Sequence, residues 1–226
     1  IARVLAQRGL TTRAAAEAFL AGEANASTDP LLLTGLPESV DRLGRAIDKR
    51  EPVVVYGDYD VDGVTATALM VQVLSALGAD VRPYIPHREE EGYGLNHEAL
   101  RTLAQQGAQV VLTVDCGIRS VAEADTARDL GIDLIITDHH VPGDELPRTF
   151  ALINPKQAGD VYPEKMLAGV GIAYKLAQGL VRAAAAKAGG ASRTWSSKAP
   201  ACRSRATYCW GPRFRVSVKP SSPNCG

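Results

Sequence analysis

The chain has 226 residues, enough for one domain of good size and a smaller extension. Its 25 basic and 25 acidic residues cancel, so the total charge indicates neither a nucleic-acid-binding nor a membrane-surface protein. The distribution is uneven, however, because residues 191–226 hold seven basic residues and no acidic one, which leaves residues 1–190 with a formal charge of −7.

The composition also excludes several other classes of protein. No apolar run approaches the ~20 residues that a membrane-spanning helix needs, and the N-terminus lacks the basic, apolar and small-residue order of a signal peptide. The four cysteines, three of them in residues 191–226, do not make a disulfide framework or a regularly spaced zinc site. We therefore expect a protein of the reducing cytoplasm that does not associate with a membrane.

The first fifty residues have the pattern of helices. Apolar residues recur at helical spacing over residues 1–20, with a break at Gly9. Residues 36–50 begin with a proline in the first turn and end with basic residues, which favours another helix. We expect residues 1–35 to form a helical extension ahead of a domain that covers residues 36–190.

From residue 53 onward, strand patterns alternate with helix patterns. The expected strands cover residues 53–57, 80–85, 109–114, 132–137 and a short stretch near 150–153, and the expected helices cover 63–77, 97–106, 119–129 and 170–187. This alternation predicts an α/β fold with a doubly wound, mainly parallel sheet flanked by helices. Ligands of such sheets bind at the carboxyl ends of the strands, so functional residues are expected there.

Three aspartates stand at alternate positions directly after the first strand, at Asp58, Asp60 and Asp62, and Gly63 follows them. Carboxylates this close repel one another unless a cation offsets their charge. The same spacing opens a calcium-binding EF-hand loop, but that loop requires a preceding helix and a glutamate at its twelfth position, which is Leu69 here. A metal site is therefore favoured, and a solvated acidic turn at the start of a helix is the alternative.

The third strand ends in Asp115. Alone, such a residue would cap a helix or form a turn about as often as it would bind a ligand. Beside the three aspartates it is suited to bridge two divalent ions. Cys116 follows it without an evident basic partner, which indicates a small buried residue rather than a nucleophile.

The fourth strand ends in Asp138, His139 and His140. One imidazole of this trio can bind a metal while the other points toward a phosphate, and Asp138 can orient an imidazole. Mixed carboxylate and imidazole ligands favour Mn²⁺ or a similar ion over Ca²⁺, and Mg²⁺ remains an alternative.

Two further segments carry candidate substrate-binding residues. Arg88 and Tyr93 lie in a loop on the expected ligand side, where arginine can pair with phosphate and tyrosine can stack on a base; for Tyr93 a plain surface loop fits equally well. Gly169, Val170 and Gly171 precede the last helix, where backbone N–H groups can cradle a phosphate. Glycines are common before helices, so this second signal is weak alone.

Four of these segments, in this order, resemble the motifs of the DHH phosphoesterase superfamily. They are GDYDVDGVTA, VDCGI, TDHH and LAGVGIAYKL, and the loop IPHREEEGYGLN is similar to that of the RecJ branch, which contains single-strand-specific 5′→3′ DNA exonucleases. The resemblance covers roughly residues 36–187. It implies a metal-dependent hydrolase of DNA repair and recombination, with two Mn²⁺ or Mg²⁺ ions and single-stranded DNA as its partner.

The resemblance also implies roles for individual residues. Carried over by position, it implies metal ligands at Asp58, Asp60, Asp62, Asp115 and His139, with Asp138 as a ligand or an orienting residue. It implies catalytic roles for Asp115, His139 and His140, the last of which would contact the scissile phosphate. It places near the substrate Arg88, Tyr93, Gly169 and Gly171.

Residues 191–226 depart from the family pattern. They hold both tryptophans and three of the four cysteines and show no periodicity. The family's further strand-end aspartate is absent from these residues, since no acidic residue follows Glu164, and we expect the DHHA1 and OB-fold domains to be absent. We expect an out-of-frame or otherwise aberrant sequence from about residue 191, in preference to a basic disordered tail, and a metal site that lacks one carboxylate.

Two alternatives to a RecJ-like exonuclease remain. The missing carboxylate and domains are compatible with a catalytically incomplete fragment that binds metal or DNA. Another DHH phosphoesterase, acting on oligoribonucleotides or cyclic dinucleotides, fits less well, because several of those enzymes carry a histidine where this chain has Tyr56 and lack the REEEGYGLN loop. A monomer is the expected oligomeric state.

Overall fold

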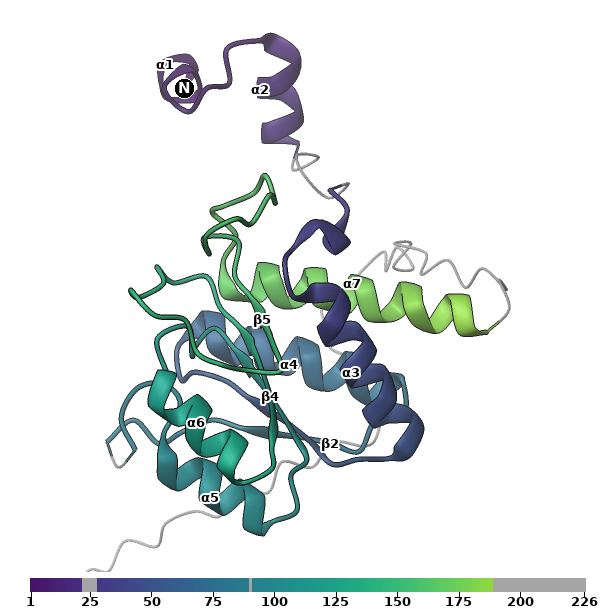
Figure 1. Ribbon diagram of the computed structural model, residues 1–226. Helices are drawn as coiled ribbons and strands as arrows, with labels where there is room; N and C mark the ends of the chain where they lie inside the picture. The colour runs from purple at the N-terminus through teal and green to yellow at the C-terminus, as the bar shows by residue number, and fades with distance from the viewer. Residues whose placement is uncertain (22–27, 90, 189–226) are drawn as a thin grey trace, which may run out of the picture. The chain divides into compact units, whose positions relative to one another are not determined.

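The computed structural model of the chain describes residues 1–21, 28–89 and 91–188 (Figure 1). The aberrant segment that we expect at 191–226 lies outside these residues. Within them, five strands form one sheet in the order β2-β1-β3-β4-β5, and every neighbouring pair is parallel. The strands are β1 (Val53–Tyr56), β2 (Val81–Tyr84), β3 (Val110–Val114), β4 (Asp133–Thr137) and β5 (Ala151–Ile153). The predicted doubly wound parallel sheet is confirmed.

Helices cover both faces of this sheet (Figure 1). Val53 and Val55 of β1 join a core with one set of helices, and Val54 and Tyr56 join a second core with the other set. The first set is α3 (Leu36–Lys49), α4 (Val61–Ala76) and α7 (Gly169–Lys187), and the second is α5 (His97–Gln105) and α6 (Val121–Asp129). Successive side chains of a strand point to opposite faces, so the apolar runs of β1 and β3 supply both cores at once.

Helix α4 begins at Val61, two residues before the predicted start. Asp60 is its N-cap, because its Oδ1 accepts the N–H of Gly63 at 2.9 Å. Asp62 therefore lies in the first turn of the helix, where a carboxylate is stabilised by the unpaired N–H groups of the helix start. The aspartate triplet thus spans the strand-to-helix turn that β1 delivers at the carboxyl edge of the sheet.

The chain begins with two short helices, α1 (Ala2–Gln7) and α2 (Arg13–Leu20). Between them Gly9 has a φ of +80°, which agrees with the predicted break in the helical pattern. A 3₁₀ helix, η1 (Pro30–Leu32), precedes α3.

The segment at 28–34 is attached to the loop that precedes α7. The Thr28 hydroxyl donates to Glu164, and the backbone N–H of Thr34 donates to Asp160 at 2.9 Å. These contacts join the segment ahead of α3 to the loop that leads into α7.

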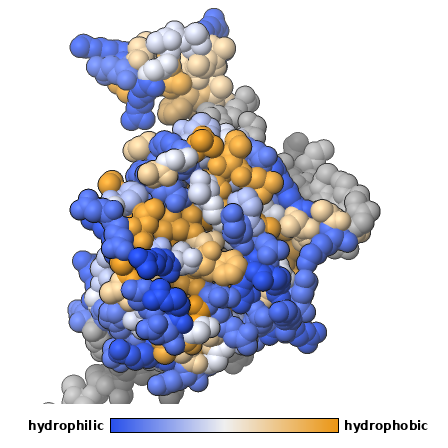
Figure 2. Space-filling model, in the orientation of Figure 1, coloured by the Kyte–Doolittle hydropathy of each residue, from blue (hydrophilic) through white to orange (hydrophobic). Residues whose placement is uncertain are grey.

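The face shown in Figure 2 is largely polar, with apolar side chains in separate patches. After Ile1, the most exposed large apolar side chains of the described residues are Met166, Val61 and Val161. No helix in the described part of the chain is both long and apolar enough to cross a membrane.

Candidate metal centre

Three neighbouring strands bring the predicted ligands to one edge of the sheet. Asp58 follows β1, Asp115 follows β3, and the Asp138 to His140 trio follows β4. Two groups of side chains there could each hold a metal ion, with ligand atoms that all lie within 4.8 Å of one another. One group is Asp58, Asp60 and Asp115, and the other is Asp115, His139 and His140. Asp115 belongs to both, which is the position that a carboxylate shared by two ions would occupy.

Asp115 has an unusual backbone conformation and an unusual side-chain environment. Its side chain is almost completely buried, and its φ of +64° lies in the left-handed region that non-glycine residues seldom adopt. Its Oδ1 forms no hydrogen bond with the described residues, although His139 Nε2 lies 3.1 Å away. Burial, and then the negative charges of Asp62 and Asp60, raise the pKa of Asp115 to about 8. A divalent cation would supply both the missing partner and the missing positive charge.

Asp58 and Asp60 complete the first group. Asp58 is 1% exposed, and its Oδ1 accepts the N–H of Tyr59 at 2.6 Å. Burial and the charge of Asp60 raise the pKa of Asp58, which again favours a nearby cation. A Cβ at Gly63 would lie 2.6 Å from the Asp58 backbone, so only glycine allows the helix to start this close to the carboxylate.

Asp62 is bound by the N-terminus of α7. Its Oδ2 accepts the N–H of Gly169 and its Oδ1 accepts the N–H of Val170, both at 2.7 Å. Its Oδ2 also lies 3.7 Å from His139 Nε2. Two of the three N–H groups that were predicted to cradle a phosphate, those of Gly169 and Val170, therefore donate to Asp62 in this structure. The substrate role of Gly169 and Gly171 stays a prediction.

Gly169 has a second reason to lack a side chain. A Cβ there would lie 2.4 Å from Asp115 Oδ1. The glycine thus allows α7 to begin directly against Asp115 while its N–H binds Asp62.

Asp138 serves the histidines through hydrogen bonds. It is 1% exposed, and its Oδ1 accepts the N–H groups of His139 and His140 at 2.7 and 3.0 Å and lies 2.7 Å from His140 Nδ1. Its Oδ2 accepts the N–H of Ile118 at 2.9 Å. Both oxygens are thus occupied and Asp138 belongs to neither metal-ligand group, so its contacts fit an orienting residue better than a ligand.

The loop between β2 and α5 reaches the same edge. The ring of Tyr93, which is 58% exposed, lies edge-on to His140 and to Tyr59, at centroid distances of 6.3 and 6.2 Å. The guanidinium of Arg88 lies 5.1 Å from the ring centroid of Tyr59. The structure therefore brings Tyr93 to the histidine side of the centre and Arg88 to Tyr59, which lies between Asp58 and Asp60. It adds Tyr59, whose only signal in the sequence is that place.

Tyr56 and Cys116, which lie near the predicted site residues in the sequence, are both buried. Tyr56 is fully buried, and its hydroxyl donates to the Gly94 carbonyl at 2.9 Å, so it anchors the end of the same loop. Cys116 is 1% exposed, and burial raises the pKa of its thiol well above the usual value. A protonated, buried thiol fits the small core residue that we predicted.

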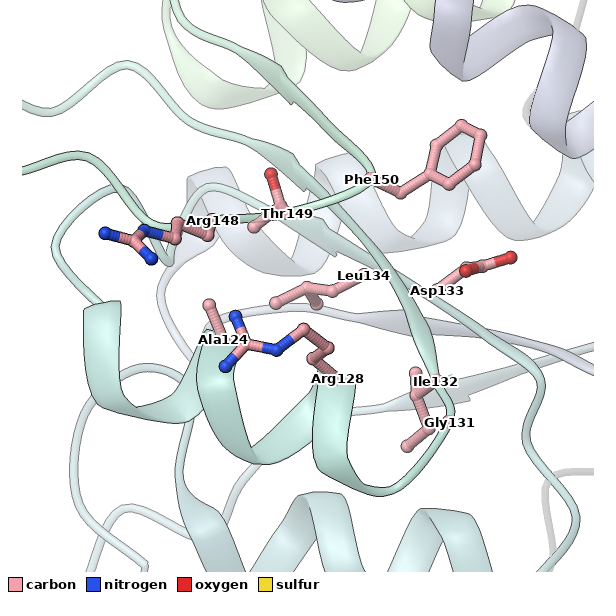
Figure 3. Close-up of a pocket in the computed structure, with 9 residues that line it drawn as sticks. All are labelled: Ala124, Arg128, Gly131, Ile132, Asp133, Leu134, Arg148, Thr149 and Phe150. Atoms are coloured by element: carbon pink, nitrogen blue, oxygen red, sulfur yellow. The ribbon is translucent and has the colours of Figure 1, made fainter.

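A pocket of about 360 Å³ lies elsewhere, beside the start of β4 and the segment that leads into β5 (Figure 3). Its lining includes Arg128, Arg148 and Phe150 and none of the predicted site residues. The candidate metal centre is thus an acidic edge of the sheet, separate from this pocket, and Arg148 offers a control position for experiments.

The family model described as the DHH family, N-terminal domain, matches residues 52–197. The single-stranded-DNA-specific exonuclease RecJ of Bacillus subtilis (strain 168) is 47% identical over 181 residues, which are 80% of this chain and 23% of that protein. The protein of the same name from Escherichia coli (strain K12) is 45% identical over 145 residues, 64% of this chain and 25% of that protein. The chain spans about a quarter of the length of these curated relatives.

Two solved structures are also similar. A crystal structure of exonuclease RecJ bound to manganese has a TM-score of 0.62 and 41% identity, and the match covers 67% of this chain and 38% of that one. The structure of RecJ in complex with Mn²⁺ from Thermus thermophilus has a TM-score of 0.57 and 35% identity, covering 67% of this chain and 21% of that one.

Proposed function

The chain belongs to the DHH family, and we propose that it acts as a metal-dependent phosphodiesterase, a RecJ-like exonuclease that degrades single-stranded DNA in the 5′→3′ direction during repair and recombination. One observation carries this proposal: the buried Asp115 belongs to two ligand groups and has an oxygen that no described residue satisfies. The names of the similar proteins support the substrate class, since they are single-stranded-DNA-specific exonucleases.

The proposed metals are two Mn²⁺ or Mg²⁺ ions, and the choice of metal is supported by two similar RecJ structures that were solved with manganese. The ions would be held by Asp58, Asp60, Asp115 and His139, together with Asp62. Asp62 belongs to neither ligand group, but each of its oxygens accepts a single N–H from α7 and keeps a second lone pair for a metal. When bound, such ions supply an acidified water and neutralise charge on the attacked phosphate. The residues around them keep the ligands in place: the α7 N-terminus holds Asp62, and Asp138 holds the backbone of both histidines.

His140 is the proposed contact to the scissile phosphate. Its Nδ1 lies 2.7 Å from Asp138 Oδ1, and a proton on Nδ1 would satisfy this contact and leave Nε2 for the substrate. Arg88 and Tyr93 would bind the strand beside it, Arg88 through phosphate and Tyr93 by stacking on a base. The contact between the rings of Tyr93 and His140 supports a place for Tyr93 beside the phosphate that His140 would contact.

The remaining parts of the proposal concern the whole chain. We assign residues 36–190 to the DHH domain and residues 1–35 to its extension, and we expect a cytoplasmic monomer. Light scattering on the purified chain tests the oligomeric state, and a mass of twice 23.9 kDa would contradict it.

One assay tests the enzyme. The chain is incubated with Mn²⁺ and a single-stranded oligonucleotide that carries a 5′ label, beside Asp115→Asn and the control Arg148→Gln. Asp115→Asn keeps the shape of the side chain and removes its charge, so we expect a loss above the ~10–100-fold typical of residues that only support a ligand. Arg148→Gln should retain full activity.

Two results of this assay would contradict the proposal. Label release without metal, or equal release by Asp115→Asn, would exclude a reaction at this centre. If Mn²⁺ binds but no label is released, the chain is the catalytically incomplete metal-binding fragment that remains the alternative.

A further inference from the structure

The turn after β5 contacts the backbone of both histidines. The Asn154 side chain, which is fully buried, donates from Nδ2 to the His140 carbonyl at 2.9 Å. The Lys156 amine donates from Nζ to the His139 carbonyl at 2.6 Å. The two side chains are linked in turn, because the Lys156 N–H donates to Asn154 Oδ1 at 2.8 Å.

The end of β5 also forms a hydrogen bond with Asp138, the residue before the two histidines. The N–H of Asp138 donates to the Ile153 carbonyl at 3.0 Å, so three consecutive residues are bonded to one short segment of chain. Residues 138–150 contain no helix or strand, so their backbone groups lack the regular hydrogen bonds of those elements and need other partners. Without Asn154 and Lys156, the carbonyls of the two histidines would lose the partners that set the direction of this backbone.

The direction of that backbone matters for the site. His139 Nε2 lies 3.1 Å from the shared carboxylate Asp115, and the His140 ring lies against Asp138. A shift of the His139 backbone would move its imidazole relative to both Asp115 and Asp62. A hydrogen bond from a charged amine is stronger than one from a neutral donor, so Lys156 is well suited to resist that shift.

We propose that Asn154 and Lys156 are positioning residues for the metal-binding and phosphate-contacting histidines. Lys156 sets the place of His139 and thereby the affinity for Mn²⁺, and Asn154 sets the place of His140 and thereby the turnover. The part of this inference that concerns turnover rests on the proposed function, whereas the part that concerns Mn²⁺ affinity does not.

Three variants test Lys156 in the full chain. Lys156→Met keeps the length of the side chain and removes the donor, and Lys156→Arg keeps donor and charge. Gln157→Met is the matched control, because Gln157 lies in the same turn and its Nε2 donates at 3.2 Å to the carbonyl of Leu152, away from the histidines. The dissociation constant for Mn²⁺ is measured by calorimetry, with Tm, kcat and KM on a single-stranded oligonucleotide.

We expect Lys156→Met to weaken Mn²⁺ binding and lower kcat by about 10-fold each, the lower end of the range for residues that support a ligand. Lys156→Arg should restore most of both, and Gln157→Met should change neither. A purely structural role is the competing explanation. It predicts that Lys156→Met and Gln157→Met lower Tm alike and leave Mn²⁺ affinity unchanged, and this result would overturn the proposal.

Asn154→Asp tests the second residue. It keeps the acceptor for the Lys156 N–H and replaces the donor to His140 by an oxygen that repels the carbonyl. We expect kcat to fall, with little change in KM and in Mn²⁺ affinity. If this buried variant does not fold, the Lys156 variants still test the positioning role.

If Lys156→Met weakens Mn²⁺ binding but even the unaltered chain releases no nucleotide, the proposed function fails and the positioning role stands. Absence of Mn²⁺ binding to the unaltered chain would overturn both.

Discussion

At the scale of single residues, Asp115 carries the strongest functional signal. A non-glycine residue with positive φ costs about 1–3 kcal/mol, and a buried acceptor without a hydrogen bond costs about 1–3 kcal/mol more. Asp115 has both features, and its carboxylate lies among other acids. Such a residue is compatible with a stable fold when a bound ligand offsets these two costs in free energy. A divalent cation beside Asp58, Asp60 and His139 would do so.

The raised pKa of Asp115 predicts a pH dependence of stability without metal. The carboxyl titrates near 4 in the unfolded chain, and burial raises its pKa to about 8 in the folded chain. The folded state therefore holds more protons between these two values, and the stability that Asp115 contributes falls as pH rises through this window. In EDTA, we expect Tm to fall from pH 5 to pH 8, and Asp115→Asn to flatten the profile. An identical profile for both chains would contradict the assignment.

Gly169 provides a second prediction at this scale. In Gly169→Ala the new Cβ would lie 2.4 Å from Asp115 Oδ1, so either Asp115 or the start of α7 must move. Since α7 also holds Asp62, we expect Mn²⁺ affinity to fall by about 10–100-fold. Gly44→Ala in α3 is the control, because a Cβ there meets nothing within 4 Å. Calorimetric titration of Mn²⁺ into both variants tests this expectation. Equal affinities would show that the site tolerates the contact between the new Cβ and Asp115.

At the scale of elements, sequence patterns predicted all five strands. Four of them, β1, β3, β4 and β5, are short and mainly apolar, whereas β2 contains Arg82 and Pro83 and is only partly buried. The patterns missed the start of α4 by two residues, since the start depends on the Asp60 cap. They also could not show that the N-terminus of α7 binds Asp62, because residues 62 and 169 meet only in the folded chain. The ligand types were predictable from the sequence, whereas the hydrogen bonds that orient them were not.

The contacts of Tyr59 with the loop between β2 and α5 predict an effect on substrate binding alone. Tyr59 contacts both Arg88 and Tyr93 through its ring, and an exposed contact of a cation with a ring contributes about 0.5–1 kcal/mol. We expect Tyr59→Leu to raise KM for a single-stranded oligonucleotide by about 2- to 10-fold. Hydrolysis of bis(p-nitrophenyl) phosphate, which is too small to reach the loop, should change little, and Tyr59→Phe should resemble the unaltered chain. Equal losses on both substrates would mean that Tyr59 acts on the metal centre.

At the scale of the whole molecule, the centre joins segments that lie far apart in the sequence. The motifs appear in the same order in the sequence as in the family, so the resemblance predicted the fold, which is confirmed, together with the candidate ligands, which stay a prediction. The family match extends to residue 197, beyond the end that we predicted for the domain. The expectation of an aberrant sequence from residue 191 lies outside the residues that the structure describes.

Metal binding should therefore stabilise the fold as a whole. The proposed ligands lie in the first turn of α4 and just after β1, β3 and β4, and residues 1–190 carry a formal charge of −7 that bound cations would reduce. A ligand that binds only the folded chain adds about 2.7 kcal/mol of stability at 100 times its dissociation constant. We expect Tm to rise with Mn²⁺ concentration at pH 7.5, to rise much less for Asp115→Asn, and to rise fully for Arg148→Gln. An unchanged Tm at millimolar Mn²⁺ would mean that these carboxylates do not form a metal centre, because a site assembled by folding must be linked to it.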